Sequence, residues 1–129
     1  MKRKVKHVGS MPPNIMLHLF QSLIEPILTY GSEVWGVYKQ GPASADKVFM
    51  KFARCLLGVK ASTSNLMTLG ECGHFPPSVP CAISVLCYLN RLHHMSDHRV
   101  VKQVFIELKR LHDLSFPTWV TQAEILINH

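Results

Sequence analysis

The fold expected for this chain depends on the stretch from Leu17 to Gly36, which reads LHLFQSLIEPILTYGSEVWG. Its apolar residues recur three and four positions apart, which predicts an amphipathic α-helix with one buried face; they are Met16, Leu17, Phe20, Leu23, Ile24, Ile27 and Leu28. Pro26 lies inside this pattern, and a proline within a helix removes one backbone hydrogen bond and clashes with the preceding turn. We therefore expect the first helix to be kinked at Pro26.

The rest of the chain carries helical apolar patterns, and no stretch of useful length alternates as a β-strand does. Asn14 is the expected cap of the first helix. Further helices are expected over about 27–37, 45–57, 80–95, 97–111 and 118–127, with at most one helical turn over 66–69. The sequence therefore predicts an all-α fold, a small bundle of five or six helices. Residues 1–13 are expected to form a basic, poorly ordered leader, and residues 14–128 a single helical domain.

The helix expected over 45–57 is two-faced. Ser44 is its expected N-cap and Gly58 its C-cap. We expect its buried stripe to consist of Val48, Phe52, Cys55, Leu56 and Val59. On another side, cations recur at offsets of four and three, at Lys47, Lys51 and Arg54, so that all three project together.

Composition indicates an ordinary globular chain. Hydrophobic residues make up 47% of the 129 residues and charged residues 17%, enough for one modest core. The longest nearly uncharged apolar run, 81–89, is far shorter than the roughly 20 residues that span a bilayer, so we expect no membrane association. No secretory signal is recognisable, and the four cysteines are then expected to be reduced thiols in a cytoplasmic or nuclear setting.

The net charge of +6 favours a polyanion such as nucleic acid as the partner. Four of the positive charges lie in the first six residues, and a second concentration runs from Lys39 to Lys60. We expect Lys47, Lys51 and Arg54, helped by Lys39 and Lys60, to lie against a phosphate backbone. The alternative is a solvated basic face with no ligand. Trp35 and Tyr38 are candidates for stacking on a base or sugar, but Tyr30 and Trp35 are better explained as core anchors.

The candidates for catalytic and metal-binding residues are weaker than those for nucleic-acid binding. The cysteines and histidine at Cys72, His74, Cys81 and Cys87 lack the paired spacing of a zinc site, and His93, His94 and His98 lack an accompanying carboxylate motif. The eight acidic residues never form the adjacent pair that holds two metal ions in a polymerase. No nucleophile motif or phosphate-binding glycine loop is present. We expect no catalytic residue, no metal, no cofactor and no small-molecule substrate.

Four blocks of the sequence resemble, in order, the segment that follows the polymerase core of LINE-type (non-LTR) retrotransposon reverse transcriptases. The blocks are 19–36 (LFQSLIEPILTYGSEVWG), 47–60 (KVFMKFARCLLGVK), 62–65 (STSN) and 70–76 (GECGHFP). The resemblance runs over about residues 11–128. In the last block this chain departs from the family pattern Gly-Glu-Leu-Gly-Arg, because Cys72 and His74 replace the leucine and the arginine.

The resemblance implies a non-catalytic fragment of an RNA-directed DNA polymerase, comprising the helical thumb-like and post-thumb region. Its expected role is to position a template–primer duplex of RNA and DNA, weakly on its own, beside palm and fingers domains that this chain lacks. Two alternatives remain open. One is a helical protein–protein interaction module, and the other is a non-functional remnant of a degraded element.

Overall fold

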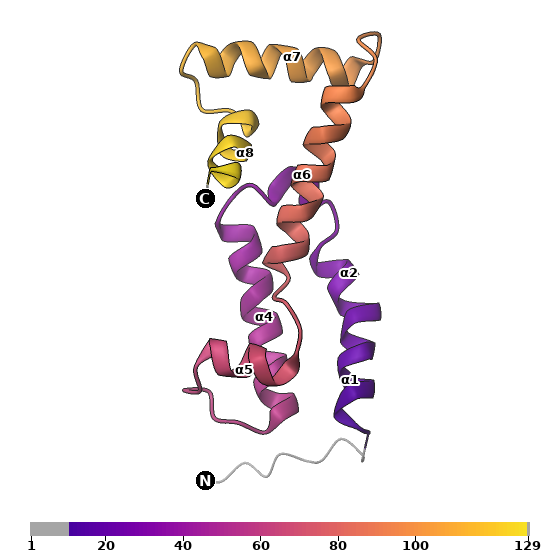
Figure 1. Cartoon of the computed structure of the whole chain (residues 1–129), viewed down its shortest axis with the longest axis vertical. Coiled ribbons are helices and arrows are strands. Elements are labelled where there is room, and N and C mark those ends of the chain that lie inside the picture. Colours follow the sequence, from indigo (N-terminus) through magenta and orange to yellow (C-terminus); the bar gives the residue numbers. More distant parts are fainter. Residues whose placement is uncertain (1–10, 129) are drawn as a thin grey trace.

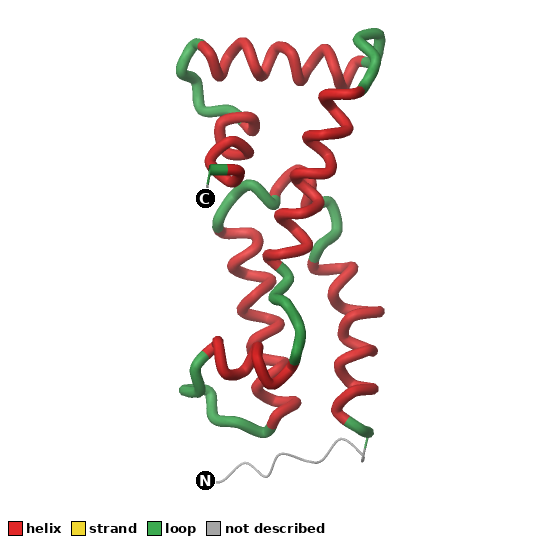
Figure 2. Tube along the Cα trace, in the orientation of Figure 1, coloured by secondary structure: helices red, strands yellow, loops and turns green. Residues whose placement is uncertain are grey.

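The computed structural model describes residues 11–128, and every regular element in that range is helical (Figures 1 and 2). The elements are α1 (Pro13–Leu19), the π-helix η1 (Phe20–Ile24), α2 (Glu25–Leu28), α3 (Ser32–Trp35), α4 (Gln40–Leu57), α5 (Asn65–Cys72), α6 (Ser78–His94), α7 (Val100–Asp113) and α8 (Trp119–Ile127). With α1, η1 and α2 counted as one, the described residues form seven helices. The predicted all-α fold is confirmed. Most of the predicted leader, residues 1–10, lies outside the described range, and Pro13 already belongs to α1.

The chain accommodates Pro26 by widening the turn that precedes it. In η1 the backbone N–H of Glu25 bonds to the carbonyl of Phe20, five residues back. This wider turn shifts the hydrogen-bond register, so that Pro26 falls in the first turn of α2, where its missing N–H leaves no gap. The predicted kink therefore takes the form of a π turn within a joined helix from Pro13 to Leu28. Asn14 is not the cap, because the helix starts at Pro13 with no side-chain hydrogen bond to its end.

The helices form an elongated arrangement around α6 (Figure 1). The joined helix α1–α2 and α4 lie along one half, α6 runs up through the centre, and α7 crosses the far end before α8 folds back. Contacts link α6 to α3, α4, α7 and α8. The expected central role of α6 agrees with these contacts, but its all-round burial does not, since Ile83 and Leu86 are exposed.

Within residues 11–128 the core consists of three small clusters of buried side chains instead of one. The first joins η1 to α4 through Phe20, Phe49, Met50 and Ala53. The second contains Val37, Val85 and Ala123, and the third Leu92, Phe105 and Val120. An elongated arrangement leaves each cluster thin, and many large apolar side chains stay exposed. The fold therefore offers long solvent-facing surfaces, both basic and apolar.

The predicted buried stripe of α4 is wrong by about a quarter of a turn. The buried residues are Ala45, Phe49, Met50 and Ala53, whereas Val48, Cys55 and Val59 are exposed. The predicted start is also wrong, because α4 begins at Gln40 and the hydroxyl of Ser44 donates 2.8 Å back to the Gln40 carbonyl. Pro42 fits in this first turn, where backbone N–H groups have no helical partner to lose.

Candidate nucleic-acid interface

Three of the predicted cations border one hollow at the C-terminal half of α4. Lys47, Lys51 and Arg54 line it together with Met50 from the same helix. The opposite wall comes from the loop after α4 and the start of α5; it comprises Val59, Ala61 and Asn65. The hollow has a volume of about 280 Å³, and none of the described carboxylates lines it. We call it the basic hollow.

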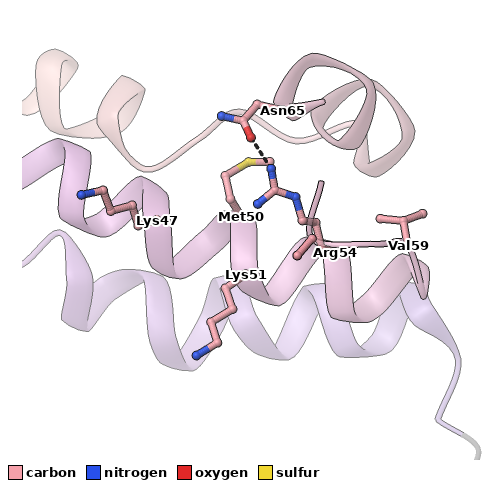
Figure 3. A pocket seen from close by; sticks show the side chains of 7 residues that line it. Lys47, Met50, Lys51, Arg54, Val59 and Asn65 are labelled. Atoms are coloured by element: carbon pink, nitrogen blue, oxygen red, sulfur yellow. Dashed lines mark hydrogen bonds between the residues drawn. The ribbon is translucent and has the colours of Figure 1, made fainter. Parts of the chain in front are cut away.

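Helical geometry explains why these cations lie on one side of α4. Lys47, Lys51 and Arg54 follow the i, i+4, i+7 spacing of one helix face, and the buried residues Ala45, Phe49 and Ala53 occupy the other side. Lys47 and Lys51 are exposed, and within residues 11–128 neither forms an ion pair with a carboxylate. Their ammonium groups are therefore available to an anionic ligand. Figure 3 shows Lys51 pointing away from Asn65, so the three cations border the hollow without converging on one point.

Arg54 is held by the loop that follows its own helix. Its Nη2 donates to the Thr63 carbonyl at 3.0 Å. The same nitrogen donates to the side-chain oxygen of Asn65 (Figure 3). Its Nε is buried, and within the described residues it has no hydrogen-bond partner. Gly58 makes this return possible, since its left-handed conformation (φ 66°) ends α4 as predicted and turns the chain back. Arg54 thus fixes the wall of the hollow and is only partly free to meet a ligand.

The other two predicted cations lie elsewhere. Lys39 is the residue before α4, fifteen positions from Arg54, and it lines hollows with Val37 and Leu126 instead. Fifteen residues of helix span about 22 Å, so one small ligand cannot contact Lys39 and Arg54 together. Lys60 is exposed in the loop next to Val59 and Ala61 but does not line the basic hollow.

The aromatic candidates differ in their contacts and in their exposure to solvent. The Trp35 indole N–H donates 2.8 Å to the Tyr30 carbonyl, and its ring lies against Gly41. Trp35 is half-buried and is not part of the three core clusters, so its role as a core anchor stays a prediction. Tyr30 is 85% exposed, which contradicts its expected role as a core anchor. Tyr38 is 50% exposed but does not line the basic hollow.

The candidate metal ligands are not brought together. Among the described residues, no three side chains of His, Cys, Asp or Glu gather where they could hold a metal ion. Cys81 is fully buried, and this burial raises the pKa of its thiol, with Asp46 and Glu25 adding to the rise and a hydrogen bond to Ser32 opposing it. His74 instead lies 3.7 Å from the carboxylate of Glu25.

Sequence reasoning missed the wall of the hollow opposite the cations, chiefly Asn65 and Ala61. The signal was present, since Gly58 ends one helix and Ser64-Asn65 starts the next only a few residues later, so the two helix ends must lie close together. No helix of the described residues is long and apolar enough to cross a membrane. Comparison with known proteins gives no match, whether to a family model, to a curated protein or to a solved structure.

Proposed function

We propose that this chain is a non-catalytic helical module that contacts the phosphate backbone of nucleic acid through α4, in the manner of the thumb-like region of a LINE-type reverse transcriptase. The observation that carries the proposal is the pair of exposed lysines, Lys47 and Lys51, one helical turn apart and unpaired within the described residues. The four ordered sequence blocks support the family assignment.

The arrangement suits backbone contact more than base reading. Lysine carries a point charge on a flexible stem, which matches phosphates but fixes no base identity. Each phosphate neutralised releases counterions, so affinity falls as salt rises. The chain is therefore expected to bind a duplex of any sequence with steep salt dependence.

Binding of a labelled RNA–DNA primer–template duplex, measured by fluorescence anisotropy between about 50 and 200 mM salt, tests the proposal. The variant Lys47→Glu/Lys51→Glu is expected to bind at least about tenfold more weakly, and its log–log salt slope to be smaller by about two. A matched control, Arg99→Glu/Lys109→Glu, makes the same change in net charge at two exposed positions near or on α7. Equal losses in the two variants would mean that net charge alone drives binding, and the proposal would be wrong.

A specific observation favours a second candidate, a protein-docking module. Large apolar side chains line the exposed side of the first helices, with Leu23 62%, Ile27 76%, Tyr30 85% and Val34 61% exposed. Such surface usually marks a contact with another protein.

Sedimentation at rising concentration separates the candidates. A monomer that binds duplex supports the first, and an oligomer that dissociates in Ile27→Lys/Tyr30→Lys and ignores nucleic acid supports the second.

A further inference from the structure

The basic hollow differs from a flat phosphate-binding surface in being concave and walled. Three cations border it on the α4 side, and the Asn65 side chain stands opposite. Because the loop after α4 is tied down by the two hydrogen bonds of Arg54, the two walls keep their spacing without a ligand. A preformed concave site binds at a lower entropic cost than one that must assemble.

The lining of the hollow combines charge with apolar surface. Met50 is 6% exposed at its base, and Val59 and Ala61 form an exposed apolar wall. An inorganic anion would use only the cations, so the apolar wall points to a ligand that carries a less polar body next to its negative charge. Sugars and bases attached to a phosphate have this character.

Its size restricts the ligand further. About 280 Å³ lies just below the lower end of pockets that enclose small molecules, about 300–1,000 Å³. A duplex presents its phosphates on the outside of a wide rod, which can touch the rim but cannot enter. An unpaired nucleotide can leave the rod and present its sugar and base to the wall. The amide NH2 of Asn65 is turned away from Arg54 and can donate to a base (Figure 3).

Building on the nucleic-acid contact proposed above, we propose that the basic hollow takes one unpaired nucleotide of a strand that overhangs a duplex. Lys47 and Lys51 meet the phosphates on either side of this nucleotide, and its sugar and base lie against Val59 and Ala61. Met50 forms the base of the site, and Arg54 holds the opposite wall in place.

Binding of two probes of equal total charge to the wild-type chain tests this proposal directly. One is a blunt duplex, and the other a shorter duplex with a single-stranded overhang. The overhanging probe is expected to bind about fivefold more tightly, because only its unpaired nucleotide buries apolar surface in the hollow. Equal binding of both probes overturns the inference and leaves the proposed function standing. Failure of both probes to bind overturns both.

A variant that fills the basic hollow tests whether the preference for the overhanging probe arises there. In Ala61→Trp the cations remain but the new ring occupies the space, so the overhanging probe is expected to bind no more tightly than the blunt duplex. Ala43→Trp places the same ring on an exposed alanine in the first part of α4, away from the hollow, and is expected to keep the preference. A preference that survives in folded Ala61→Trp, checked by circular dichroism, overturns the assignment to this hollow.

Discussion

The indole N–H of Trp119 donates a hydrogen bond of 3.0 Å to the backbone carbonyl of Val34, 85 residues earlier in the chain. The bond joins α8 to α3. The Trp119 ring also meets the edge of Tyr88 from α6, with ring centroids 6.0 Å apart. Trp119 therefore lies where the start, middle and end of the described chain come together, and it links the second and third core clusters.

Replacing Trp119 by phenylalanine keeps an aromatic ring but removes this N–H donor. We expect Trp119→Phe to lose about 1 kcal/mol of stability, or about 4 °C in the melting temperature. Tyr38→Phe serves as the control, because within the described residues the Tyr38 hydroxyl makes no side-chain hydrogen bond and the ring is half exposed. Indistinguishable melts of the two variants would show that the long-range bond adds nothing.

Two glycines are expected to respond in opposite directions to alanine. A Cβ at Gly41 would overlap the six-membered ring of Trp35, with Cζ3 only 2.8 Å away, whereas a Cβ at Gly70, inside α5, meets nothing within 4 Å. Gly41→Ala should destabilise the fold by about 1–3 kcal/mol, and Gly70→Ala should stabilise it by about 0.4–1 kcal/mol. Urea unfolding of both variants measures the difference. A neutral or stabilising effect of Gly41→Ala would contradict the packing of Trp35 on Gly41.

Local patterns in the sequence predicted the helices well but not the buried face of α4. The end of that helix was readable because Gly58 alone supplies the left-handed residue that terminates it. The buried face was not, because Val48 and Cys55 offer as much apolar surface as Ala45 and Ala53. The segment that packs against α4 decides which of its faces is buried. Small alanines on α4 let the ring of Phe20 pack with its centroid 5.5 Å from that of Phe49. Such shape matching between distant segments is invisible to a hydrophobic pattern.

Sequence patterns likewise predicted some features of the candidate site and missed others. Helical spacing predicted that Lys47, Lys51 and Arg54 project from one side of α4, and all three line the basic hollow. It gave no hint that Arg54 bonds to Thr63 and Asn65, because those bonds require the loop after α4 to fold back. The sequence reasoning also grouped Lys39 with the other cations. Positive residues that lie near one another in the sequence can be far apart in space when a helix runs between them.

Asp46 couples α4 to the start of α6. Its Oδ1 accepts a hydrogen bond of 2.8 Å from the backbone N–H of Ser78, the first residue of α6. A carboxylate at the start of a helix accepts a hydrogen bond from a backbone N–H that has no partner within the helix. Its negative charge also interacts favourably with the helix dipole. We expect Asp46→Ala to cost about 1–2 kcal/mol in thermal or urea unfolding, and Asp46→Asn less, because the amide oxygen still accepts.

The same aspartate-to-alanine change at Asp113 provides the control for Asp46. Asp113 is the exposed last residue of α7, where a negative charge opposes the dipole. Its removal should leave stability unchanged or raise it slightly. A loss at Asp113 equal to that at Asp46 would show that the Ser78 bond is not the cause.

We expect His93, near the end of α6, to make the stability of the fold depend on pH. The side chain of His93 is largely exposed, but the limited burial that it has lowers the pKa of its imidazole below 6.5, and the charges of Lys109, Lys102 and His94 lower it further. Its ring and that of Phe105 form a T-shaped pair with ring centroids 5.3 Å apart. The unfolded chain therefore takes up this proton first as pH falls. Since the unfolded state then binds more protons, the free energy of unfolding decreases as pH drops below about 6.5.

The imidazole of His93 can be tested by substitution and by direct titration. His93→Gln should lose a smaller part of its stability than the wild type between about pH 7.5 and 5.5, measured by urea unfolding at each pH. Lys109→Met removes one of the charges that lower the pKa, so an NMR titration of the His93 ring should move toward 6.5 in that variant. If the His93 ring of the wild type titrates at or above 6.5, folding does not disfavour its charged form, and the predicted loss of stability at low pH does not arise from it.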